Sequence, residues 1–259
     1  APPPIEEVVA RIRETRPEAV FAPHVETSAG IILPDDYISQ MAQAAHEVGA
    51  ILVLDCIASG CAWVDIDALG VDVLISAPQK GWSASPSAGV VVFSELAEAR
   101  LEQTTSSSFA IDLKKWRSIM VAYEGGGHAY HATMPTDAIM GFRDAMLETK
   151  AMGFAEAKAA QFELGSKVRN LLADKGIVSV AADGFAAPGV VVSFTADPAM
   201  QNGSLMRAQG LQIAAGVPLQ VGEGDAFRTF RLGLFGLDKL KDVDGTVASL
   251  TKGLEAAQA

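Results

Sequence analysis

A lysine and an aspartate that each follow an apolar run are the residues of this sequence best suited to chemistry. Lys80 lies among small residues, with Ser76 and Ala77 before it and Gly81 after it. A lysine in such a partly desolvated setting can lose its proton and attack a carbonyl carbon to form a Schiff base. From its position alone, an ordinary surface lysine in a loop is an equally good interpretation.

Asp55 directly follows the apolar run at 51–54. A carboxylate there can hold a metal ion or the ring N–H of a ligand, or it can cap the next turn. No further ligands are spaced for a metal, so we expect no metal site. A strand-end aspartate near a strand-end lysine suits pyridoxal 5′-phosphate, because the lysine holds the aldehyde and the carboxylate keeps the pyridine nitrogen protonated.

The elements that must position these residues alternate between helical and strand patterns. Helical spacing is present at 4–16, and Asp35 or Asp36 can cap a second helix that Gly49 ends. Continuous apolar runs predict strands at 19–23, 51–54, 71–77 and 90–93. Such buried strands between helices indicate a parallel or mixed α/β sheet. Ligands bind at the carboxyl edge of such sheets, where residues 24–28, Asp55 and Lys80 are expected together.

The second half of the chain has a different pattern. A long helical stretch covers 134–175 and is interrupted near Gly153. After it, strands are predicted at 177–180, 189–194 and 230–234, and helices near 198–209 and 238–257. We therefore expect a smaller α+β domain packed on the first one, with the long helix as connector.

Composition excludes several classes of protein. Among 259 residues, 20 Lys and Arg stand against 31 Asp and Glu, a net charge of −11 that disfavours nucleic-acid binding. Cys56 and Cys61 make neither a disulfide framework nor a zinc site, which favours a reducing, cytoplasmic location. No apolar run is long enough to span a membrane, and the N-terminus is unlike a secretory signal.

Five segments follow one another along nearly the whole chain: HVETSAG (24–30), LDCIASG (54–60), QKGW (79–82), YHATMP (130–135) and FRLGLFG (230–236). Together they resemble the class V aminotransferases, pyridoxal-phosphate enzymes of fold type I, and above all the alanine–glyoxylate and serine–glyoxylate branch. Two departures leave the substrate open: residues 85–89 replace the usual proline-rich turn, and Ala132 stands where that branch often has a second histidine.

The resemblance implies a role for several side chains. Lys80 would be the Schiff-base lysine, Asp55 the partner of the pyridinium nitrogen, Thr27 a hydrogen-bond partner on the side of the ring 3-hydroxyl, and Gln79 a neighbour of the cofactor phosphate. Arg231 would bind the substrate α-carboxylate, for which its planar guanidinium is suited. Without the resemblance, an interior or interface salt bridge is the favoured interpretation of Arg231.

In this family the Tyr and Thr of the fourth motif, here Tyr130 and Thr133, reach the cofactor phosphate of the neighbouring subunit. The resemblance therefore implies a homodimer with shared active sites. His24 would have a positioning role near the cofactor. His46 lies in a helical pattern, and we expect it at the surface. Residues 125–127, three glycines, are expected to form a flexible turn.

The expected fold is a three-layer, fold type I large domain over residues 1–150, followed by a small C-terminal α+β domain over 151–259. The family fold normally starts before this chain does, so the large domain is expected to be N-terminally truncated. The expected activity is transamination of a small amino acid such as alanine or serine, with glyoxylate or pyruvate as acceptor. The alternatives are a lyase of the same fold, kynureninase- or desulfurase-like, and a non-catalytic fragment. Desulfurases need a thiol on a mobile loop. Both cysteines of this chain follow Asp55 in what should be packed structure, which argues against a desulfurase.

Overall fold

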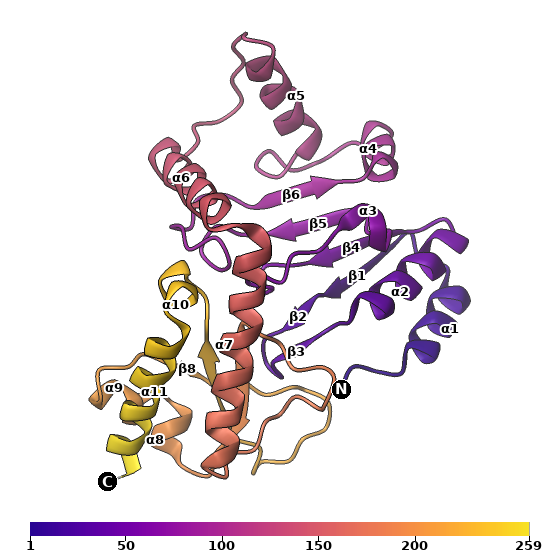
Figure 1. Ribbon diagram of the computed structural model, residues 1–259. Coiled ribbons are helices and arrows are strands. Elements are labelled where there is room, and N and C mark those ends of the chain that lie inside the picture. The colour runs from indigo at the N-terminus through magenta and orange to yellow at the C-terminus, as the bar shows by residue number, and fades with distance from the viewer. Residues whose placement is uncertain (259) are drawn as a thin grey trace.

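The computed structural model describes residues 1–258, and its first part is built on a four-stranded sheet (Figure 1). The strands lie in the order β1-β4-β5-β6, with β1, β4 and β5 parallel and β6 antiparallel to β5. Their bounds are Ala19–Pro23 (β1), Ile51–Asp55 (β4), Val73–Ser76 (β5) and Val90–Phe93 (β6). The predicted mixed α/β sheet and its four strands are confirmed.

Two amphipathic helices, α1 (Ile5–Thr15) and α2 (Asp35–Glu47), pack together against this sheet. Ile12 of α1 and Ile38 of α2 are buried in one apolar cluster with Leu52 and Leu54 of β4. The predicted cap of α2 is wrong. Its N-cap is Pro34, which makes no side-chain bond, and the two following aspartates lie inside the first turn, where their charge stabilises the helix dipole.

The buried carboxylate of Asp72 forms hydrogen bonds with three other segments of the chain. Asp72, 2% exposed, accepts hydrogen bonds from the Leu52 amide (2.8 Å), His46 Nε2 (2.8 Å) and Ser94 Oγ (3.1 Å). The surface position expected for His46 is confirmed, because its side chain is 37% exposed, and its ring also bonds Asp72. Each of these bonds removes the cost of burying an unpaired polar group.

Two short strands, β2 (Val25–Glu26) and β3 (Ile31–Ile32), form an antiparallel hairpin after β1. The sequence analysis placed polar loop residues here and did not predict the hairpin. Beyond β5 the chain forms further helices: α3 (Ile66–Leu69), α4 (Glu95–Glu102), α5 (Leu113–Glu124), α6 (Thr136–Met152) and α7 (Phe154–Asp174). The last two confirm the long helical stretch with its break at Gly153.

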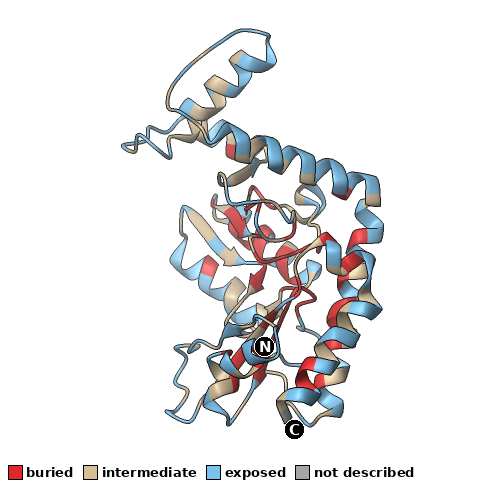
Figure 2. Ribbon diagram, turned by 90° about the vertical axis from the view of Figure 1, so that its left-hand side faces the viewer, coloured by how far each residue is buried: buried red, intermediate tan, exposed pale blue. Residues whose placement is uncertain are grey.

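A second, antiparallel sheet has the order β7-β9-β8, with strands Val190–Phe194 (β7), Ala214–Ala215 (β8) and Thr229–Gly233 (β9). Four helices accompany it: α8 (Pro198–Gln201), α9 (Ser204–Ala208), α10 (Leu237–Lys241) and α11 (Val243–Gln258). One apolar cluster joins α7 to this sheet and its helices, including Leu164, Val191 and Phe230. Figure 2 shows buried residues along one side of α7, whereas α5 and α6 are mostly exposed.

The strand predicted at 177–180 does not form. This segment makes one isolated bridge to β7, Ser179 with Ser193, and two flanking hydrogen bonds before it turns away. Val178 remains 64% exposed, so the segment gains little burial from longer pairing.

No helix within residues 1–258 combines the length and apolar composition needed to cross a membrane. In the same part of the chain, no group of three or more His, Cys, Asp and Glu side chains is arranged to hold a metal ion.

Candidate active site

Asp55 is the last residue of β4 and lies at the carboxyl edge of the sheet. Its neighbours across the sheet are Pro23 in β1 and Ile75 in β5. Its side chain is exposed, and Oδ1 accepts a hydrogen bond from the Ile57 amide at 2.9 Å. This local bond orients the carboxylate while leaving oxygen lone pairs free for a ligand.

Lys80 follows β5 in a tight turn at the same edge. The turn rests on the segment after Asp55: a Cβ on Gly81 would lie 2.3 Å from the Gly60 carbonyl oxygen, so the two backbones touch. On its other side, Ser83 Oγ accepts a hydrogen bond from the Leu237 amide at 3.0 Å. The turn that carries Lys80 is thus fixed between the first sheet and the start of α10.

A hollow of about 400 Å³ is lined by residues of the two segments that carry Asp55 and Lys80. Its walls include Ile57, Ile75 and Gln79, together with the loop 86–89. The hydroxyl oxygen of Ser87, in that loop, is buried and has no hydrogen-bond partner among the residues described. Asp55 and Lys80 are not among its lining residues, but each has a close chain neighbour there, Ile57 and Gln79. The hollow therefore combines apolar walls with an unpaired polar group.

A buried histidine, His24, follows β1 and lies next to Asp55. The His24 amide donates to the Asp55 carbonyl oxygen at 2.8 Å, and its ring Nδ1 lies 2.7 Å from Ser59 Oγ. Burial lowers the pKa of His24 to about 4, so the ring is neutral near pH 7 and adds no charge beside Asp55. The sequence analysis expected a positioning role for His24 but did not identify Ser59, although it lies in the second motif.

Thr27 lies in the turn between β2 and β3 and is half-buried. The Glu26 carboxylate holds this turn by accepting hydrogen bonds from the amide (2.9 Å) and hydroxyl (2.5 Å) of Ser28. At the end of the turn, the Gly30 carbonyl accepts a hydrogen bond from Arg169 of α7 at 3.2 Å. Burial lowers the pKa of the Arg169 guanidinium to about 10. The sequence analysis did not single out this arginine.

Arg231 lies in the middle of β9, and its Nε donates to the Ala215 carbonyl of β8 at 2.8 Å. No ion pair forms at Arg231 within residues 1–258, so the salt bridge considered for it is not present there. Its remaining N–H donors can face a carboxylate.

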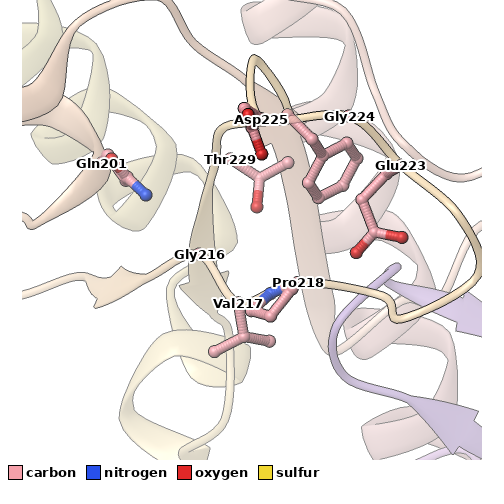
Figure 3. A pocket seen from close by; sticks show the side chains of 9 residues that line it. Gln201, Gly216, Val217, Pro218, Glu223, Gly224, Asp225 and Thr229 are labelled. Carbon is pink, nitrogen blue, oxygen red and sulfur yellow. The ribbon is translucent and has the colours of Figure 1, made fainter.

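A second hollow, of about 260 Å³, lies further along β9 at Thr229 (Figure 3). Glu223 and Asp225 line it, and backbone N–H groups lower the pKa of the Glu223 carboxyl. Two acidic side chains disfavour the binding of a substrate carboxylate here. This hollow is therefore a poor candidate for the substrate site.

Tyr130 and Thr133 lie between α5 and α6, and the Tyr130 side chain is 68% exposed. Their hydroxyl oxygens are 3.2 Å apart, and neither contacts Lys80 or Asp55 within the described chain. The structure thus brings Asp55 and Lys80 to one edge of the sheet, while Tyr130 and Thr133 lie in the segment between α5 and α6.

Comparison with known proteins places this geometry in a family. The model of the family described as aminotransferase class V matches residues 4–219. The chain belongs to the class V aminotransferases. Class V aminotransferases use pyridoxal 5′-phosphate. The resemblance found in the motifs is therefore confirmed.

Curated relatives of this class V chain include an alanine–glyoxylate aminotransferase from Callithrix jacchus, 24% identical over 97% of this chain and 60% of the relative. A 2-aminoethylphosphonate–pyruvate transaminase from Burkholderia ambifaria is 30% identical over 94% of this chain and 63% of the relative. A solved alanine–glyoxylate aminotransferase from Nostoc sp. has a TM-score of 0.84 at 22% identity, covering 99% of this chain and 66% of that one. It confirms the fold, and this chain spans less than two thirds of the curated relatives' length.

The residues present fit the cofactor of the family. Ile57 and Ile75 offer apolar walls to a flat ring, and the unpaired Ser87 hydroxyl offers a polar contact. Lys80 has an amine that can bond an aldehyde, and Asp55 has a carboxylate that can accept from a ring N–H. This donor set is the one that pyridoxal phosphate chemistry requires.

Proposed function

We propose that this chain takes part in pyridoxal-phosphate-dependent transamination of a small amino acid, of alanine or serine type, with glyoxylate or pyruvate as acceptor. The observation that carries the proposal is the position of Asp55 and Lys80, which follow the adjacent parallel strands β4 and β5 at one edge of the sheet, where their chain neighbours Ile57 and Gln79 line a hollow. The names of the relatives, which transfer amino groups to glyoxylate or pyruvate, support the acceptor class.

In this proposal Lys80 holds the aldehyde carbon of the cofactor, and Asp55 accepts the hydrogen bond of the pyridine N–H. The bound cofactor supplies an electron sink for the bond between Cα and hydrogen of the substrate. Lys80, once free, would take the proton from the substrate Cα as general base and would later donate it as general acid. His24 stays neutral behind Asp55, so the negative charge of Asp55 remains available to the ring nitrogen.

Three further residues orient the reactants. Arg231 binds the substrate α-carboxylate with the donors that its bond to Ala215 leaves free. Thr27 donates to the oxygen side of the ring, and Gln79, exposed at the hollow, lies by the phosphate.

We also propose a homodimer in which Tyr130 and Thr133 reach the phosphate in the partner's site. The exposed apolar side chains around them support this, since such surfaces usually mark interfaces. They are Phe109 (68% exposed), Ile111 (73%), Met120 (63%), Val121 (55%) and Tyr130 (68%). The same proposal divides the chain into a large domain that ends at residue 150 and a small domain that begins at residue 151. It also includes a cytoplasmic location, which the two unpaired thiols support.

The desulfurase alternative is disfavoured by both cysteines of this chain. Burial raises the pKa of Cys56 to about 12 and that of Cys61 to about 11. A buried, protonated thiol is a poor sulfur acceptor, because the thiolate is the nucleophile.

The test is the absorption spectrum of the purified protein after addition of pyridoxal phosphate. We expect a band at the edge of the visible range that shifts with alanine and is missing in Lys80→Ala. The same samples, given alanine and glyoxylate, should yield pyruvate and glycine. A protein that stays colourless, or one whose band is unaffected by Lys80→Ala, would contradict the proposal.

A further inference from the structure

The ε-ammonium group of Lys80 faces an aromatic ring. Nζ lies 5.6 Å from the centroid of the Phe235 ring. No hydrogen bond or ion pair of Nζ is formed with any other residue in the described part of the chain. A cation within about 6 Å of a ring centroid is attracted by the negative face of the ring. Phe235 is therefore the group that determines where this amine rests.

Phe235 occupies a slot that two glycines leave open. A Cβ on Gly189 would lie 3.0 Å from the ring Cε1 atom, and a Cβ on Gly60 would lie 3.4 Å from it. The backbone beside the ring is fixed by the Leu234 amide, which donates to the Gly189 carbonyl at 2.9 Å. The ring also packs against the apolar cluster around Val190. Its position is thus set by backbone contacts.

The same glycine supports both partners. Gly60 touches the Phe235 ring on one side, and its carbonyl supports Gly81, the neighbour of Lys80, on the other. Any movement of the Lys80 turn relative to the ring must displace the backbone at Gly60. The fold therefore fixes the lysine turn relative to the ring, and the Lys80 side chain places its amine over that ring.

We propose that Phe235 is a positioning residue for Lys80: its ring face holds the free ammonium group whenever the lysine is not bonded to the cofactor. The inference rests on the proposed function, in which Lys80 is released, carries a proton and returns. A lysine side chain has several rotatable bonds, and holding its end against a ring removes most of that freedom before the return step. An aliphatic side chain can fill the slot but offers no attraction for a cation.

The test measures the reactivity of Lys80 in cofactor-free protein. A short pulse of acetic anhydride acylates neutral amines, and peptide mass spectrometry gives the rate at Lys80 relative to the other lysines of the same sample. The variants are Phe235→Leu and Phe235→Met, which keep an apolar side chain, and Phe235→Tyr, which keeps the ring. Thermal unfolding of each variant shows whether the fold is intact.

We expect acylation of Lys80 to be about threefold faster in Phe235→Leu and Phe235→Met, because the lost attraction at a partly exposed site is of that size. Phe235→Tyr should match the natural protein. Equal rates in all variants, or acylation in Phe235→Tyr as fast as in Phe235→Leu, would overturn the inference even if stability changes. The pyridoxal-phosphate band of the natural protein tests the proposed function separately, because acylation needs no cofactor.

Discussion

Gly81→Ala is the substitution that most sharply tests how the candidate lysine is positioned. The new methyl carbon would lie 2.3 Å from the Gly60 carbonyl oxygen and 2.6 Å from its carbonyl carbon. Non-bonded contacts prefer about 3.5 Å, so one backbone must move by roughly 1 Å. Gly81 has no left-handed backbone angle, and steric contact alone is therefore the cause.

Two effects of different size follow from this displacement. Overpacking of this kind costs about 1–3 kcal/mol of stability, or several degrees in the melting temperature. A shift of about 1 Å in a reacting group costs about 100-fold in rate. We therefore expect a protein that still folds but binds pyridoxal phosphate slowly and has kcat/KM for transamination lowered by about two orders of magnitude.

Gly141→Ala, in α6, is the matched control. A Cβ at Gly141 meets nothing within 4 Å, and its backbone angle is also ordinary. The control should keep the cofactor absorbance and kcat/KM of the natural protein and should unfold at no lower temperature. The reasoning is refuted if Gly81→Ala keeps full activity, or if Gly141→Ala loses as much.

Three other predictions concern buried groups. Asp72→Ala leaves three hydrogen-bond donors unpaired and should lower the free energy of unfolding by about 3 kcal/mol in urea denaturation, whereas exposed Asp67→Ala should change it by less than about 0.5 kcal/mol. Because the pKa of His24 is lowered from 6.5 to about 4, stability should fall by about 3 kcal/mol as the pH drops from about 6.5 to 4; an equally steep decline in His24→Gln would contradict this. With pKa values of about 12 and 11, Cys56 and Cys61 should not react with a thiol-specific disulfide reagent at pH 8 until denaturant is added, and prompt reaction of the native protein would refute their burial.

Much of the first sheet follows from local pattern. Continuous apolar runs predicted β1, β4, β5 and β6, and the residues after them gave Asp55 and Lys80. The prediction for 177–180 failed because a run of branched residues becomes a strand only when a neighbour pairs along its length. Here β7 pairs with the segment through one isolated bridge, and the extent of this pairing cannot be read from the sequence of the segment itself.

The sequence by itself determined which residues could do the chemistry, because residue type and position after a strand are local properties. The motifs likewise determined the family, because their residues and their order along the chain can be read without a structure. The tertiary structure alone decided which groups these residues meet. Three contacts join distant parts of the chain: the Phe235 ring with Lys80, the Gly60 carbonyl with Gly81, and the His46 ring with Asp72. Helical and strand periodicity reports only on neighbours a few residues apart, so such contacts arise when separate elements pack into one interior.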